Sequence, residues 1–153
     1  MSQFDATVAW QRGAQQFTDN RYRRAHEWVF DGGARVPASS SPLSVPVPLS
    51  DPAGVDPEEA LVAATSSCHM LWFLLLAAKA GYTVDQYIDR AFGVLGQNSD
   101  NKIALTRITL RPQVVFSGAQ QPTPEQLAAL HHQAHESCTI ANSLRAEVVL
   151  ELL

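Results

Sequence analysis

Residues 56–81 read DPEEALVAATSSCHMLWFLLLAAKAG and predict a long central helix around which the rest of the chain is arranged. Asp56 suits the helix N-cap and Pro57 the first helical position, and the two glutamates that follow place negative charge at the positive end of the helix dipole. Gly81 is typical of a residue that ends a helix. Because the segment is apolar on nearly every face, we expect a helix enclosed by protein rather than one on a surface.

A membrane-spanning interpretation of this segment is disfavoured. Crossing a bilayer takes ~20 consecutive apolar residues. The polar run TSSCH at residues 65–69 interrupts the segment at its centre, and acidic residues begin it.

The composition predicts one domain spanning residues 1–153, with 46% hydrophobic residues and a net charge of −4. The negative charge argues against a nucleic-acid or anionic-membrane partner, since these are bound through Lys and Arg. The amino terminus has neither a basic start nor an apolar signal core, so we expect a reducing cytoplasm. In that compartment the two cysteines are expected to serve chemistry rather than to form a static crosslink.

The amino-terminal part predicts strands. Apolar residues that alternate from Phe4 to Trp10 predict a first strand ending near Gly13, and a second strand is predicted from Arg21. Strand periodicity places Arg24 on an inward aromatic face together with Tyr22, His26, Trp28 and Phe30. A buried guanidinium costs several kcal/mol unless an anion meets it, so we expect a partner for Arg24. The proline-rich run at residues 37–52 predicts an edge strand and a covering loop.

The remaining chain predicts an α+β fold of strands, long helix, strands, helix and strand. Residues 86–95 and 102–116 predict two strands joined by a hairpin turn at residues 98–101. The sequence Thr123-Pro124-Glu125 predicts the start of a helix that runs to about Ser137. Residues 143–153 predict a closing strand.

The two cysteines, Cys68 in the central helix and Cys138 just past the second helix, are 70 positions apart and can meet only through the fold. A purely structural interpretation is two buried small apolar side chains. The polar neighbours of both cysteines, TSSCH and HESCT, disfavour it, because core cysteines rarely need such surroundings.

Both cysteine segments resemble segments of one protein family. DPEEALVAATSSCHM resembles the first-cysteine helix of the OsmC/Ohr family of thiol peroxidases, in which an acidic residue follows a proline ten positions before the cysteine. AHESCTIANS is similar to the second-cysteine segment of that family, A-H-x-x-C-x-x-(S)-N. The order of elements and the length also fit, so the resemblance covers nearly the whole chain.

The resemblance implies an OsmC-like fold, an intertwined homodimer and an antioxidant peroxidase for organic hydroperoxides that acts in oxidative stress. It implies that Cys68 attacks the peroxide and that Cys138 resolves the sulfenic acid as an intramolecular disulfide. It implies no cofactor, and a dithiol reductant such as a lipoylated protein. It also implies an arginine from the amino-terminal strands, held by the glutamate at the helix start, which is Glu58 here. Only a thiolate attacks the O–O bond, and burial in apolar surroundings raises a thiol pKa, so we expect a cation beside Cys68.

Three arginines are candidates for that cation. Counting back from the DGG turn gives Arg23 or Arg24, strand parity favours Arg24, and Arg35 is the third. Ten helical residues separate Glu58 from Cys68 by ~15 Å along the axis. An Arg–Glu pair that reaches Cys68 is therefore most simply supplied by a second subunit.

Two competing interpretations concern the histidines and the function. His131 and His135 lie one helical turn apart and, with His132, suggest zinc, but suitably spaced further ligands are missing, so we expect no metal and a partly exposed helix face. His69 lies about 100° around the helix from Cys68 and is expected to be packed or hydrogen-bonded rather than to act as a base.

The alternative function is a redox-responsive dimeric binding or sensing protein of the same fold. Peroxide turnover with a dithiol donor would distinguish the peroxidase from this sensing protein.

Overall fold

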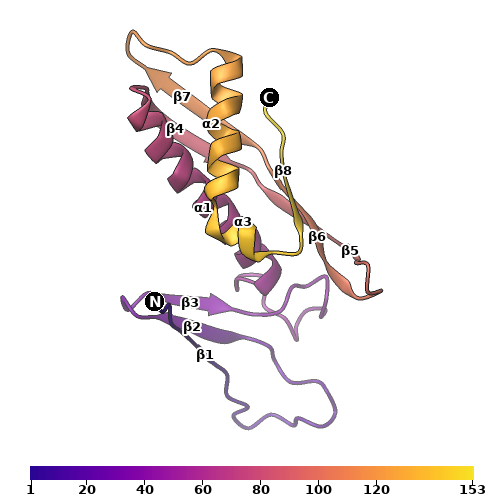
Figure 1. Ribbon diagram of the computed structural model, residues 1–153. Coiled ribbons are helices and arrows are strands. Elements are labelled where there is room, and N and C mark those ends of the chain that lie inside the picture. Colours follow the sequence, from indigo (N-terminus) through magenta and orange to yellow (C-terminus); the bar gives the residue numbers. More distant parts are fainter. The chain divides into compact units, whose positions relative to one another are not determined.

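The computed structural model describes all 153 residues and confirms the α+β class. The chain divides into two compact units, Met1–Ala60 and Leu61–Leu153, which are described separately (Figure 1). The prediction of one domain spanning the chain stays a prediction. The elements in chain order are β1 (Ala6–Ala9), β2 (His26–Phe30), β3 (Arg35–Ala38), α1 (Pro57–Lys79), β4 (Thr83–Asp89), β5 (Phe92–Gln97), β6 (Ile103–Leu110), β7 (Pro112–Ser117), α2 (Pro124–Ser137), α3 (Thr139–Ser143) and β8 (Glu147–Leu150).

The amino-terminal unit is an antiparallel sheet in the order β1-β2-β3, followed by an irregular proline-rich segment. The predicted edge strand is β3, which contains Pro37. An edge position tolerates a proline because its missing N–H faces no partner strand. The predicted covering loop follows it, and a single bridge between Ala38 and Val55 ties the end of that loop back to the sheet.

The second predicted strand begins five residues later than expected, at His26 rather than Arg21. The reason is that the backbone of Arg23 bonds to side chains instead of to a neighbouring strand. Its N–H donates to Gln15 Oε1 at 2.7 Å, and its carbonyl accepts from Trp10 Nε1 at 2.9 Å. These bonds satisfy the backbone without a ladder.

The start and stop signals of α1 are confirmed. Asp56 and Glu59 form a capping box, in which the Glu59 N–H donates to Asp56 Oδ1 at 2.8 Å and the Asp56 N–H donates to Glu59 Oε1 at 2.9 Å. Gly81 ends the helix at φ 85°, and the Tyr82 N–H donates to the carbonyl of Ala77. A positive φ is the left-handed conformation that glycine adopts without a Cβ clash.

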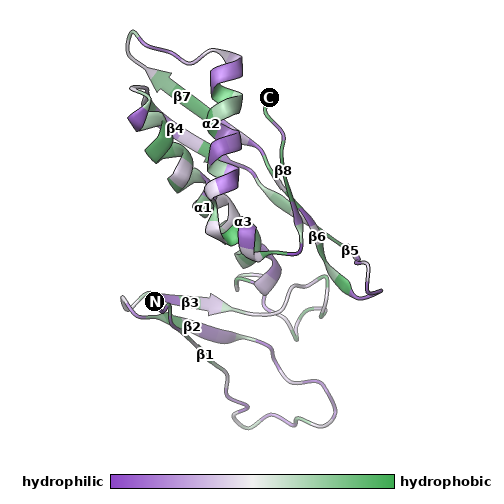
Figure 2. Ribbon diagram, in the orientation of Figure 1, coloured by the Kyte–Doolittle hydropathy of each residue, from purple (hydrophilic) through white to green (hydrophobic).

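The prediction that α1 is enclosed on nearly every face is wrong for the single chain. Only one stripe at a spacing of four residues is buried, namely Thr65, His69, Phe73 and Ala77. Leu71 on another face is 61% exposed. Figure 2 shows how apolar the helix is along its length. By length and composition α1 could span a membrane, a criterion that core helices of soluble proteins also meet.

Each of the two strands predicted after α1 is in fact two strands. β4 pairs with β7 and β5 pairs with β6, with the breaks at residues 90–91 and 111. The carboxylate of Asp89 explains the break, because it accepts the Arg111 N–H at 2.7 Å and the Ser66 hydroxyl of α1 at 2.5 Å. That N–H is thereby taken out of the strand ladder. The predicted hairpin turn at residues 98–101 is confirmed, and the Asn98 N–H donates to the Lys102 carbonyl.

The carboxyl-terminal elements follow the prediction with one addition. α2 covers the predicted residues and is capped by Thr123, whose hydroxyl accepts the Gln126 N–H in a capping box. The closing strand is β8, which pairs in parallel with β6. The short helix α3 was not predicted, because five residues are too few to show a helical period.

The core of the second unit fixes α1 against α2. Phe73 and Ala77 of α1 contact Leu130 and Ala134 of α2, and this cluster packs on side chains of β4 and β7. Figure 2 shows α2 as a mixture of hydrophilic and hydrophobic residues, whereas β7 is mainly hydrophobic. Losing a buried phenylalanine of this kind typically costs about 3–5 kcal/mol. The packing therefore holds the carboxyl-terminal part of α1 against the second half of α2.

Candidate active site

The second unit brings the two cysteines together at the junction of α2 and α3. Cys68 lies on α1 and is half-buried, Cys138 is 1% exposed, and both are free thiols. Cys138 ends α2 and caps α3, and its sulfur accepts the Ala141 N–H at 3.4 Å. Cys68 Sγ lies 3.7 Å from the Thr139 hydroxyl oxygen.

The surroundings shift the pKa values of the two thiols in opposite directions. Burial raises the pKa of Cys68, but hydrogen bonds from the Ile140 backbone, the Cys138 thiol and Thr139 outweigh it and leave the pKa lowered. The pKa of Cys138 is raised by burial and by the neighbouring Cys68. Cys68 is therefore the first of the pair to become a thiolate, with Cys138 as its hydrogen-bond donor.

The donors that stabilise the Cys68 thiolate were missed by sequence reasoning. They come from the first residues of α3, Thr139 and Ile140. The sequence predicts a cation beside Cys68, whereas within Leu61–Leu153 hydrogen-bond donors alone lower the pKa of this thiol. The only signal was the polar run after Cys138, which does not reveal a helix of five residues.

The histidines are explained by a buried pair between α1 and α2. His69 Nε2 lies 3.0 Å from His131 Nδ1, and burial lowers the pKa of each to about 4. The prediction that His69 is packed or hydrogen-bonded is confirmed. The expectation of a partly exposed face is wrong for His131, which is 1% exposed. His131 turns toward His69 because its ring also stacks on Phe73, with the ring centroids 4.2 Å apart.

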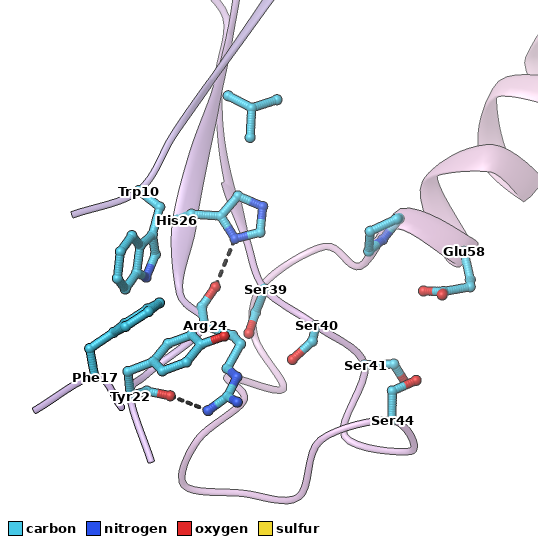
Figure 3. Close-up of a pocket in the computed structure, with 12 residues that line it drawn as sticks. Trp10, Phe17, Tyr22, Arg24, His26, Ser39, Ser40, Ser41, Ser44 and Glu58 are labelled. Atoms are coloured by element: carbon cyan, nitrogen blue, oxygen red, sulfur yellow. Dashed lines mark hydrogen bonds between the residues drawn. The ribbon is translucent and has the colours of Figure 1, made fainter. Parts of the chain in front are cut away.

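Arg24 and Glu58 line one pocket of the amino-terminal unit (Figure 3). The pocket has a volume of about 490 Å³. The guanidinium donates to the Asn20 carbonyl at 3.1 Å, to Asn20 Oδ1 at 2.9 Å and to the Tyr22 carbonyl, and it lies over the Tyr22 ring. Its partners are neutral oxygens rather than the expected anion. Glu58 shares the pocket but forms no ion pair with Arg24.

The other two candidate arginines lie elsewhere in this unit. Arg35 forms an exposed ion pair with Glu27 at 2.5 Å. Arg23 lines a second pocket, of about 330 Å³, that Glu58 does not line. Of the three candidates, only Arg24 shares a pocket with Glu58.

Comparison with known proteins gives the family. Residues 50–153 match the family model described as OsmC-like protein. The chain belongs to the OsmC-like family. The matched range includes Cys68, Cys138 and Glu58, whereas Arg24 lies before it.

Relatives of this OsmC-like chain agree with the assignment. Peroxiredoxin OsmC of Escherichia coli K12 is 29% identical over 98 residues, which are 64% of this chain and 66% of the relative, just under two thirds of its length. An OsmC-like protein of unknown function from Vibrio cholerae is 58% identical, with both chains fully covered and a TM-score of 0.98. The organic hydroperoxide resistance protein OhrB of Bacillus subtilis shares the fold at 20% identity, with a TM-score of 0.66 and 98% of each chain covered. These likenesses confirm the predicted family and fold.

Proposed function

We propose that this OsmC-like protein is a cytoplasmic thiol peroxidase that reduces organic hydroperoxides. The observation that supports it most is the polarised thiol pair, in which Cys68 has a lowered pKa and the buried Cys138 beside it a raised one. The E. coli relative is named a peroxiredoxin, and the B. subtilis protein of the same fold an organic hydroperoxide resistance protein. Both names agree with such a role.

The proposed reaction assigns one step to each cysteine. The Cys68 thiolate attacks the terminal peroxide oxygen, the O–O bond breaks, and the alkoxide leaves as an alcohol after taking up a proton. Sulfur is thereby oxidised to a sulfenic acid. The Cys138 thiol then attacks that sulfur, a disulfide forms and water is released. A dithiol reductant, for which a lipoylated protein is our candidate, returns two electrons and two protons.

Arg24 and Glu58 complete the proposed site from a second subunit. Their shared pocket in the amino-terminal unit supports treating them as one functional group of residues. Ten helical residues put Glu58 ~15 Å along the axis from Cys68 of its own chain, which favours a homodimer in which the pocket of one subunit serves the thiol of the other. The guanidinium would orient the peroxide oxygens through its forked donors.

Peroxide oxidation of single-cysteine variants tests this function. We expect Cys68→Ser to abolish hydroperoxide consumption, and Cys138→Ser to allow one turnover and leave a Cys68 sulfenic acid that a dimedone-type probe traps. Stopped-flow measurements with hydrogen peroxide and a bulky organic hydroperoxide give the substrate preference. A trapped adduct on Cys138 in Cys68→Ser would reverse the assignment. Single oxidation without dithiol-driven turnover would favour the sensing alternative.

A further inference from the structure

The backbone of Arg24 is held at both of its polar groups although it lies outside the strand ladder. Its N–H donates to the Leu49 carbonyl at 2.8 Å, and its carbonyl accepts from His26 Nδ1 at 2.7 Å. The His26 bond joins residues two apart along the chain, just where β2 begins. Figure 3 shows the His26 ring turned back onto this carbonyl at the pocket wall.

Two neighbours fix the proton of His26. A carbonyl oxygen only accepts, so Nδ1 carries the hydrogen toward Arg24. An indole N–H only donates, and Trp28 Nε1 lies 3.1 Å from His26 Nε2, so Nε2 is the acceptor. Both ring nitrogens are thereby occupied in one neutral tautomer. The ring therefore has no free nitrogen left to act as a base.

We propose that His26, with its tautomer fixed by Trp28, is a positioning residue that holds Arg24 in the orientation needed for the peroxidase reaction. The inference rests on the proposed function, because it assumes that Arg24 acts on the Cys68 thiolate and its peroxide. No carboxylate pairs with the guanidinium. Its direction is therefore set by its bonds to Asn20 and Tyr22 together with the position at which the backbone of residue 24 is held.

A hydrogen bond that holds the Arg24 backbone in place is expected to favour catalysis. An electrostatic donor accelerates a reaction when it is already aimed at the place where charge develops. A misplacement of ~1 Å can cost ~100-fold in rate. Between Asn20 and His26 the chain is irregular, so the Leu49 carbonyl and the His26 side chain, rather than strand pairing, set the position of the Arg24 backbone.

Substitutions at His26 separate positioning from simple stability. His26→Leu fills the same space without a donor, and we expect it to slow hydroperoxide oxidation of Cys68 by about 10-fold or more and to raise the Cys68 pKa measured by alkylation. In His26→Asn, the amide nitrogen takes the place of Nδ1 and should restore the rate to within about 3-fold of the parent. A folded His26→Asn as slow as His26→Leu would overturn the proposal.

A double-mutant cycle tests whether His26 acts through Arg24. In the Arg24→Ala background, His26→Leu should cause no further loss of rate and no further rise in the Cys68 pKa. The same additional loss in both backgrounds would show that His26 acts independently, and the proposal would be wrong.

Two further variants keep the test decisive if His26→Leu does not fold. Trp28→Phe removes the indole N–H that fixes the tautomer while keeping an aromatic ring, and we expect a slowing of about 3-fold. An unchanged rate in folded Trp28→Phe would refute the role of Trp28. Glu27→Gln, on the same strand, loses the ion pair with Arg35 and should leave the rate unchanged. An equal slowing in Glu27→Gln would mean that any damage to β2 produces the effect.

The proposed function and this inference fail in different experiments. Undiminished hydroperoxide consumption by Cys68→Ser would refute the proposed peroxidase function. A slow Arg24→Ala combined with a full-rate His26→Leu would leave the function standing and remove only the positioning role.

Discussion

Arg24 differs from the other arginines near it in what its guanidinium contacts. Arg35 is neutralised by a carboxylate on the exposed side of the sheet, whereas Arg24 meets carbonyl oxygens at a pocket wall. A cation without an anionic partner retains its full charge for a bound thiolate or peroxide. This difference supports Arg24 over Arg35 as the catalytic arginine of the proposed site.

Removing Arg24 should therefore affect the reactive thiol. We expect Arg24→Ala to raise the Cys68 pKa and to slow peroxide oxidation ~100-fold, because one preorganised electrostatic donor is lost. Arg24→Lys should recover only part of the rate, since it keeps the charge but not the fork. The measurement is the pH dependence of Cys68 alkylation together with the oxidation rate.

Arg23→Ala is the matched control and should be nearly silent, while Glu58→Ala should resemble a mild Arg24 loss. A Cys68 pKa that is unchanged in Arg24→Ala but raised in Arg23→Ala or Arg35→Ala would identify a different arginine.

At the residue scale, sequence reasoning located the thiols better than their surroundings. The family resemblance carried by the flanks of Cys68 and Cys138 was enough to predict that the two thiols act together, because both motifs are local. The hydrogen-bond donors of Thr139 and Ile140 could not be predicted from the sequence, since their role depends on a contact between α1 and α3 that joins residues 71 positions apart. Arg24 was placed on a strand that does not reach it, because side-chain bonds to Arg23 and Arg24 replace the ladder there.

At the scale of elements, the contact between α1 and α2 depends on two neutral histidines. Burial lowers the pKa of both His69 and His131 to about 4, from an ordinary value near 6.5. His135 adds to the lowering at His69, while Asp89 opposes it. A histidine with a lowered folded-state pKa binds its proton preferentially when unfolded. Its contribution to stability is therefore complete above pH 6.5 and is lost as the pH falls toward 4.

The free energy of unfolding should accordingly decrease between pH 6.5 and 4. A lowering of this size corresponds to an upper limit of roughly 3 kcal/mol for one histidine. Urea unfolding at several pH values measures it. Replacing both histidines by leucine should flatten the profile in that range, whereas His132→Ala on the exposed side of α2 should leave it unchanged. A double variant with the parent profile would contradict the assignment.

The bounds of the two long helices α1 and α2 were predictable to within a residue or two, whereas the short helix α3 and the breaks within the later strands were not. Capping boxes at Asp56 and Thr123 are local signals, so both helix starts were readable from the sequence. The split of the later strands depends on Asp89 bonding to Ser66 and Arg111, which are 23 and 22 positions away. A short stretch of sequence therefore cannot predict where these strands break.

For the whole molecule, the exposed apolar side of α1 predicts a homodimer. Leu71 is 61% exposed and Leu75 is 43% exposed, although both lie on the long apolar helix. A stable dimer typically buries about 1,200–2,000 Å² or more, and an apolar face of this kind favours such an interface. We expect sedimentation at low micromolar concentration to show a dimer.

Leu71→Glu should weaken that dimer by placing a charge in its interface. A folded monomer of the parent protein at low micromolar concentration would refute both the predicted dimer and the proposed site shared between subunits.

The parallel pairing of β8 with β6 has a consequence for the order of folding. Glu147 lies opposite Arg107, forty positions earlier, whereas β5 and β6 are joined by a tight turn. Closing the longer loop carries the larger entropic cost, so the hairpin is expected to form first and β8 to dock last. Local opening should retrace that order in reverse. Amide hydrogen exchange should show the N–H groups of β8 exchanging in a partly open state, in which Ile108 and Leu110 are briefly uncovered while the hairpin stays protected.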